Sequence, residues 1–81
     1  MSNIFIGLPV YNGEKYLAAA LDCLLAQTHR DFTVLISDNA STDSTEEIGR
    51  AYAARDPRIR YHRHAQNRGA APNFNFCVEQ A

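Results

Sequence analysis

Two polar loops of this sequence carry residue types that could bind a nucleoside. The first, residues 9–14, offers an aromatic ring, a side-chain amide and a carboxylate at Tyr11, Asn12 and Glu14. The second begins with Asp38, at the end of an apolar run. An aromatic ring can stack on a base, and a carboxylate can accept hydrogen bonds from an imide N–H or from ribose hydroxyls. The same residue types also form turns, so Asp38 as an Asx-turn former and Tyr11 as a rim residue remain an open alternative.

Three more residues stand where they could complete this site. Pro9 precedes Tyr11 in the first loop, and Asn39 follows Asp38 in the second. Arg68 lies in a later loop. Its guanidinium could reach a base carbonyl or a phosphate, because it presents several donors in a rigid fork. A solvated loop arginine is the alternative.

Other chemistry has weaker support. Asp43 stands just before a predicted helix, so helix capping accounts for it. His62 and His64 share one face of a predicted strand, yet no third ligand has suitable spacing, so we predict solvated edge histidines and no metal site. No P-loop, dinucleotide-binding or Gly-x-Ser-x-Gly pattern is present. No catalytic residue is assigned.

The elements that position these loops follow from the apolar pattern. Residues 4–10 form a nearly continuous apolar run, which predicts a strand buried on both faces, and residues 32–37 form a second run. Residues 58–64 alternate between apolar and charged side chains, which is typical of a half-exposed strand at a sheet edge. Helices are predicted over residues 14–27, from the polar cluster after residue 37 to Asp56-Pro57, and from about Pro72 onward.

The three predicted helices each have an apolar stripe. The residues that we expect to be buried are Tyr16, Leu17, Ala20, Leu21, Leu24 and Leu25, then Ile48, Ala51 and Tyr52, then Phe74, Cys77, Val78 and Ala81. Glu14 is predicted to lie near the positive end of the first helix dipole. The order β-α-β-α-β-α predicts a parallel sheet with helices on both faces, a three-layer α/β architecture. The carboxyl ends of parallel strands meet at one edge, so the polar loops should converge there.

Length and charge limit the remaining possibilities. A chain of 81 residues is at most one small domain, and 46% hydrophobic with 21% charged residues is an ordinary globular composition. A formal net charge of -1 gives no broad attraction to nucleic acid. The sequence has no apolar run long enough to span a bilayer and no secretory leader at its start, so we expect a cytoplasmic location. Cys23 and Cys77 are predicted to be buried thiols without a disulfide.

The order of these motifs resembles the opening of family 2 glycosyltransferases. The residues that carry the resemblance are Pro9-Val10-Tyr11-Asn12-Gly13-Glu14, Gln27-Thr28, the run from Ser37 to Asp43, Asn67-Arg68-Gly69, Asn73 and Asn75. The resemblance covers essentially the whole chain, residues 1–81. It implies the N-terminal portion of a GT-A fold, which is Rossmann-like and binds the nucleotide of an activated sugar, usually a uridine diphosphate sugar.

The resemblance also implies roles for single residues. Pro9 and Tyr11 would pack around the base, Asp38 would bond the pyrimidine, and Arg68 would assist near the base. Glu14 would order the loop or lie near the nucleotide. In that family the usual pair at the start of the second loop is Asp-Asp, whereas this sequence has Asp38-Asn39, which keeps the first carboxylate and changes the second position.

The remaining parts of such an enzyme would lie beyond Ala81. By the resemblance these are the Asp-x-Asp motif that holds Mg²⁺ or Mn²⁺, the general base and the site for a glycan, lipid or other hydroxyl acceptor. The last predicted helix reaches the final residue without a stop signal, so we expect an incomplete domain that is inactive alone. Membrane association of the full-length form is left open. The resemblance also implies that a further strand would lie beside the first one. We therefore expect the free edge of the first strand to pair with another copy of the chain, to exchange elements with it, or to be covered by residues beyond this sequence.

Two other interpretations remain. A non-catalytic α/β module could use the same sheet for oligomerisation or for binding a small ligand. A phosphate-accepting receiver domain has less support, because Pro9 and Tyr11 stand where its paired acidic residues would be.

Overall fold

The computed structural model describes residues 4–26 and 31–80, apart from the side chains at positions 71, 74 and 78. Gln27-Thr28 and Ala81 therefore lie outside the described residues. The elements are β1 (Ile4–Val10), α1 (Leu17–Leu25), β2 (Phe32–Asp38), α2 (Thr45–Arg55), β3 (Ile59–Arg63) and α3 (Ala70–Gln80). This is the predicted order of strands and helices.

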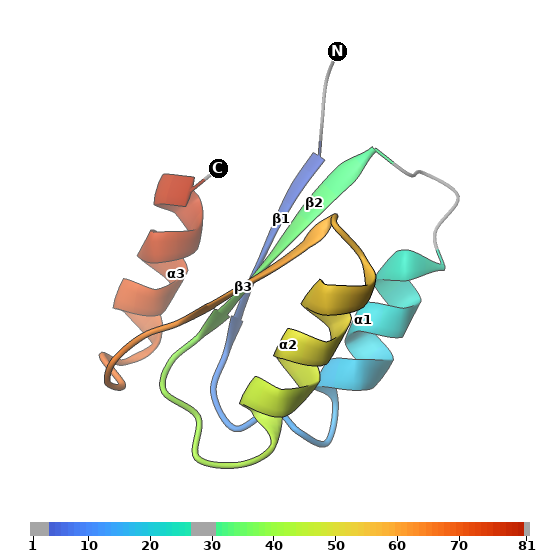
Figure 1. Ribbon diagram of the computed structural model, residues 1–81. Helices are drawn as coiled ribbons and strands as arrows, with labels where there is room; N and C mark the ends of the chain where they lie inside the picture. The colour runs from blue at the N-terminus through green and yellow to red at the C-terminus, as the bar shows by residue number, and fades with distance from the viewer. Residues whose placement is uncertain (1–3, 27–30, 81) are drawn as a thin grey trace.

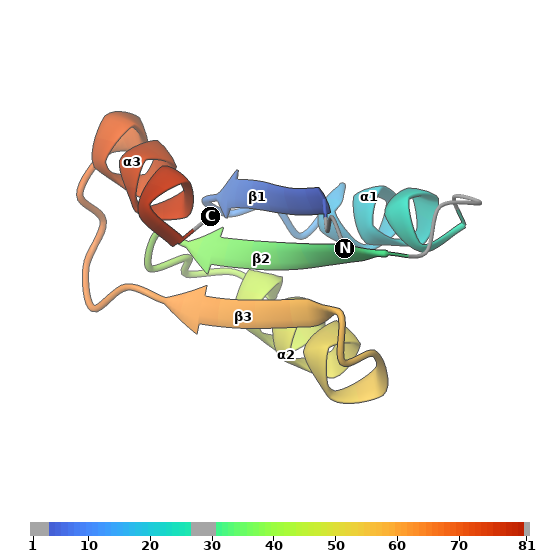
Figure 2. The same ribbon diagram turned by 90° about the horizontal axis from the view of Figure 1, so that it is seen from above.

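The sheet is parallel, with the strand order β1-β2-β3. Figure 1 shows α1 and α2 on one face and α3 on the other, and Figure 2 shows the same layers from above. Contacts of α3 with β1 and β2, and of α2 with β2 and β3, hold these layers together. The predicted three-layer α/β architecture is confirmed.

The hydrophobic core forms around the central strand. Val34 and Ile36 of β2 are fully buried, and Leu17 and Leu21 of α1 pack into the same cluster. Each large aliphatic side chain buried in this way stabilises the fold by about 1.5–3 kcal/mol before entropy costs. β2 is buried along nearly its whole length because, of the three described strands, it is the one with a neighbouring strand on each side.

β1 differs from the prediction of a strand buried on both faces. It lies at the sheet edge, and within it only Val10 is buried. An apolar run therefore did not distinguish an edge strand from a central one. Hydrogen bonds join β1 to β2 alone among the described strands, so pairing of its free edge with another copy remains a prediction.

Three side chains that we expected to be buried are exposed. Tyr16 precedes the first turn of α1, which begins three residues later than predicted. Ala51 is exposed on α2, and the buried residues of this helix are Thr45 and Gly49. Cys23 is exposed, whereas Cys77 is buried as predicted.

The approach of α2 to β3 gives a first stability prediction. A Cβ atom at Gly49 would lie 2.6 Å from Cδ1 of Tyr61. A glycine-to-alanine change in an open helix stabilises by about 1 kcal/mol, but overpacking a core costs about 1–3 kcal/mol. We therefore expect Gly49→Ala to lower the free energy of unfolding by about 1–2 kcal/mol in urea denaturation. A more stable variant would contradict the packing, and in a Tyr61→Ala background the same substitution should no longer destabilise.

Candidate nucleotide-binding site

Three loops meet at the carboxyl ends of the strands. The register pairs Val10 with Asp38 and Asp38 with Arg63, so the loops that follow β1, β2 and β3 start side by side. The backbone N–H of Asn39 donates to the carbonyl of Val10 at 2.9 Å, and that of His64 donates to the carbonyl of Asp38 at 2.8 Å. The predicted convergence of the polar loops is therefore present.

Side chains of the first loop bind the second loop. The Asn12 amide oxygen accepts from the Thr42 N–H at 2.8 Å, and the Asn12 N–H donates to Ser41 Oγ at 2.8 Å. Asn12 adopts a φ of 51°, a left-handed conformation that asparagine tolerates better than most residues. Glu14 lies before α1, and its carboxylate accepts from the N–H of Ser44 at 2.9 Å, the residue that precedes α2. Glu14 thus lies in the turn that leads into α1, near the helix start as predicted, while its carboxylate binds the residue before α2, a contact that the sequence did not indicate.

The start of α2 is fixed from the same loop. Thr45 Oγ1 accepts from the Gly13 N–H at 2.8 Å and donates to Asp43 Oδ1 at 2.5 Å. Desolvation acts to raise the pKa of Asp43, but hydrogen bonds from Thr45 and the backbone of Glu14 outweigh it and leave the pKa lowered. Asp43 also accepts from the Thr45 N–H at 2.9 Å, which agrees with the predicted capping role.

Asp38 is fully buried at the end of β2, and its carboxylate has internal partners. One oxygen accepts from the Ser41 N–H at 2.9 Å, which closes the turn. The other accepts from the Tyr61 hydroxyl and lies 3.5 Å from the Arg63 guanidinium. Burial and the bond to Asp38 raise the pKa of Tyr61 well above its ordinary value, so the phenol stays a donor. Asp38 therefore organises the site, and its contact with a base remains a prediction.

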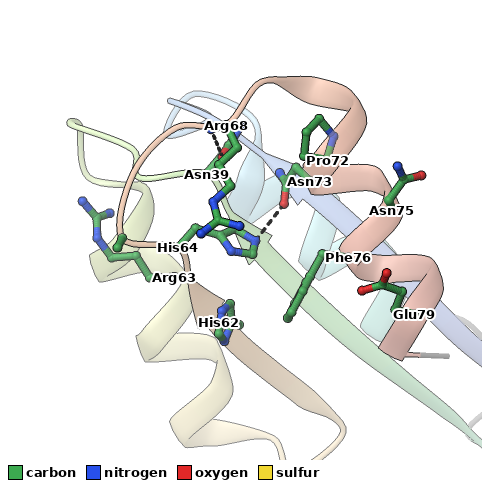
Figure 3. A pocket seen from close by; sticks show the side chains of 11 residues that line it. Asn39, His62, Arg63, His64, Arg68, Pro72, Asn73, Asn75, Phe76 and Glu79 are labelled. Carbon is green, nitrogen blue, oxygen red and sulfur yellow. Dashed lines mark hydrogen bonds between the residues drawn. The ribbon is translucent and has the colours of Figure 1, made fainter.

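Two open pockets lie beside these loops. An inner pocket of about 460 Å³ is lined by Pro9, Val10, Tyr11, Asn39, Asn67, Gly69, Ala70 and Asn73. An outer pocket of about 630 Å³ lies between β3 and α3, and Figure 3 shows side chains that line it. Asn39 and Asn73 line both pockets. Of the residues that we predicted, Pro9, Tyr11 and Asn39 come together at the inner pocket, whereas Arg68 lines the outer one.

A buried polar cluster under the outer pocket was missed from the sequence. Asn73 is 4% exposed, and its amide nitrogen donates to the Ser37 carbonyl at 3.0 Å. Its amide oxygen accepts from Ser37 Oγ and lies 3.1 Å from His64 Nε2, as the dashed line in Figure 3 marks. His64 is thus an internal partner of β2 and α3, which corrects the prediction that it is a solvated edge histidine. The one sequence signal for this cluster was the alternation of residues 58–64, which placed His64 on one face of the predicted strand.

The other histidine packs against α3. The His62 ring stacks on Phe76 with 4.6 Å between centroids, and lies 4.8 Å from the His64 ring. Desolvation and the neighbouring His64 lower the pKa of His62, so it favours the neutral form. Within residues 4–26 and 31–80, no three His, Cys, Asp or Glu side chains are grouped so as to hold a metal ion. No described helix is long and apolar enough to cross a bilayer.

Residues 5–81 match the sequence profile of a family described as Glycosyl transferase family 2. The chain belongs to this family. An uncharacterised glycosyltransferase of Rickettsia felis is 35% identical over 80 residues, which is 99% of this chain and 13% of that protein. The resemblance that the loop motifs indicated is confirmed.

Two solved structures share the fold. Mannosyltransferase PcManGT from Pyrobaculum calidifontis, in complex with GDP-Man and Mn²⁺, superposes with a TM-score of 0.84 and 25% identity, over 98% of this chain and 24% of that one. TarS of S. aureus superposes with a TM-score of 0.87 and 28% identity, over 99% of this chain and 24% of that one. The family 2 chain described here thus spans about a quarter or less of these proteins.

Proposed function

We propose that this family 2 chain forms the nucleotide-binding part of a glycosyltransferase that moves a sugar from a nucleotide sugar to an acceptor hydroxyl. The observation that carries the proposal is the inner pocket at the junction of the loops after β1 and β2. Ligands of open parallel sheets bind at this edge, where the strands end. The GDP-Man bound to PcManGT supports the same class of donor.

The inner pocket offers contacts suited to a nucleoside. Tyr11 is 47% exposed at its wall, so the ring face is available for stacking on a base. Pro9 adds an apolar surface, and Asn39 lies opposite the first loop within the same lining. Contact between Asp38 and a base requires the Tyr61 or Arg63 side chain to move, because the carboxylate has no exposed surface.

Two further residues act from the margins of this pocket in the proposal. Glu14 and Asn12 keep the first loop attached to the second, so they order the pocket without touching the base. Among the described side chains, none forms a hydrogen bond or an ion pair with the Arg68 guanidinium, and Arg68 lines the outer pocket. From there it would reach a base carbonyl or a phosphate.

A divalent cation, Mg²⁺ or Mn²⁺, fits the family but not the described residues of this chain. No set of three suitable ligands occurs among them, and the carboxylates nearest the inner pocket are engaged. A cation in such an enzyme would screen the diphosphate charge. The chain's own residues bind and orient the nucleoside, and no step here depends on a metal.

Calorimetry on the complete protein tests this function. Uridine diphosphate and guanosine diphosphate would be titrated separately, each with and without Mn²⁺. We expect binding of at least one of them, and tighter binding of the uridine nucleotide. Absence of binding by either nucleotide in the presence of Mn²⁺ would remove the proposal. Tighter binding of the guanosine nucleotide would keep the donor class and replace the base.

A further inference from the structure

Asn39 connects the nucleotide loops to the segment between β3 and α3. Its side chain is nearly buried, and its amide nitrogen donates to Asn67 Oδ1 at 2.9 Å and to the Gly69 carbonyl at 2.9 Å. Its amide oxygen accepts from the Arg68 N–H at 3.0 Å. Its own backbone N–H donates to Val10 at the end of β1. One amide thus makes three hydrogen bonds to a loop about 30 residues away in the sequence.

The orientation of this amide is set by groups that cannot exchange roles. The backbone N–H of Arg68 can only donate, and the backbone carbonyl of Gly69 can only accept. Position 39 therefore requires a side chain that donates two hydrogen bonds and accepts one. Asparagine meets this requirement, whereas an ionised aspartate, which only accepts, does not.

Residues 67–69 depend on this partner for their shape. Gly69 has a φ of 91°, a backbone conformation that residues other than glycine rarely adopt. Its N–H donates to Asn67 Oδ1 at 2.7 Å. Asn67 Oδ1 thus accepts from both Gly69 and Asn39. Asn67 and Gly69 line the inner pocket, and Arg68 lines the outer one.

We propose that Asn39 is a positioning residue whose amide fixes residues 67–69 as the wall between the inner and outer pockets. Its effect on the ligand rests on the proposed function, because the wall bounds the pocket that would receive the nucleoside. The hydrogen bonds themselves do not depend on that function.

An isosteric Asn39→Asp substitution separates this role from simple packing. The new carboxylate could still accept from the Arg68 N–H, but its second oxygen would face the oxygens of Asn67 and Gly69 without a proton to share. Protonation of that carboxyl at low pH would restore one donor. The substitution should therefore disturb the conformation of residues 67–69 more at about pH 8 than at about pH 5.

Other groups near position 39 also titrate or carry charge, so a reference variant is needed. The charged and titratable side chains that line the outer pocket with Asn39 are His62, Arg63, His64, Arg68 and Glu79, and Asp38 precedes it in β2. Asn39→Ala removes the amide without adding a titratable group. The effect of the new carboxyl group is therefore read from the exchange rate, or the affinity, of Asn39→Asp divided by that of Asn39→Ala at each pH.

Hydrogen–deuterium exchange on the complete protein tests the wall without any ligand. We expect the amides of Arg68 and Gly69 to exchange about tenfold faster, or more, in Asn39→Asp at about pH 8, a factor equivalent to about 1.4 kcal/mol. For these amides, the ratio of the exchange rate in Asn39→Asp to the exchange rate in Asn39→Ala should be smaller at about pH 5 than at about pH 8. Gln66→Glu is the matched control, because Gln66 is exposed, lies outside both pockets and undergoes the same amide-to-acid change. Exchange in Asn39→Asp equal to that in Gln66→Glu would overturn the proposal.

Nucleotide titration then separates the positioning role from the proposed function. We expect about tenfold weaker binding of uridine diphosphate by Asn39→Asp at about pH 8, with partial recovery relative to Asn39→Ala at about pH 5. Faster loop exchange combined with unchanged affinity would overturn the effect on the pocket. Faster loop exchange in a protein whose wild type binds no nucleotide would support the wall and remove the proposed function. If Asn39→Asp does not fold, as judged by circular dichroism, faster loop exchange in Asn39→Ala supports the wall and unchanged exchange overturns it.

Discussion

Asp38→Ala is expected to lower the free energy of unfolding by about 3 kcal/mol or more. The substitution removes the buried acceptor of the Ser41 N–H and the Tyr61 hydroxyl, and it separates Arg63 from its buried ion-pair partner. Leaving such donors without partners costs about 1–3 kcal/mol each, and breaking a buried pair costs more than an exposed one. A domain of this length has a total stability on the order of 4–12 kcal/mol. Urea denaturation of the variant would therefore show a large shift of the midpoint.

Two milder variants identify the cause of this loss. Asp38→Asn keeps the shape and one acceptor for Ser41 but removes the charge, so we expect a smaller loss of about 1–2 kcal/mol. Tyr61→Phe removes only the hydroxyl, and it leaves Asp38 Oδ2 with Arg63 alone, so about 1–2 kcal/mol should be lost. Equal stability of Asp38→Ala and the wild type would show that the carboxylate is not the centre of the loop junction.

Tyr11→Ala is expected to have the largest effect on ligand binding. Stacking of a base on an aromatic side chain is worth about 1–3 kcal/mol, so the dissociation constant for uridine diphosphate should rise by roughly 5- to 150-fold. The ring is already exposed at the inner pocket, so its removal should change stability little. Calorimetry on the complete protein measures the affinity, and thermal unfolding checks the stability.

Controls for this prediction come from the same loop region. Tyr11→Phe keeps the ring and should retain most of the affinity. Tyr16→Ala removes another exposed tyrosine that does not line the inner pocket, so its effect on affinity should be small. If Tyr11→Ala and Tyr16→Ala weakened binding equally, Tyr11 would have no special contact with the nucleoside.

The affinity measurements require the complete protein, because the chain described here covers only a small part of each relative. The chain covers 13% of the Rickettsia felis relative and 24% of each solved structure named above. The pocket that we propose for a nucleoside is formed by the residues described here. The proposed transfer of a sugar would also involve an acceptor, for which the described residues offer no site.

Local sequence patterns determined the element order and the site of convergence. Apolar runs and helical spacing gave the order β-α-β-α-β-α, and that order with crossovers of this length implied a parallel sheet. Parallel strands place their carboxyl ends at one edge, so Tyr11 and Asp38 had to follow neighbouring strand ends. These conclusions depend on periodicity and chain direction, which are properties of short segments.

Contacts between distant segments were decided only by the tertiary structure. Tyr61 and Arg63 reach Asp38 across about 25 residues, and the alternation of residues 58–64 indicated neither contact. An apolar run has the same composition in an edge strand as in a central one, so the exposure of β1 depended on which neighbours it has. Asn39 owes its role to donors and acceptors of a loop that only folding brings within hydrogen-bond distance. Side-chain partners are set by packing in space, and spacing along the chain does not encode them.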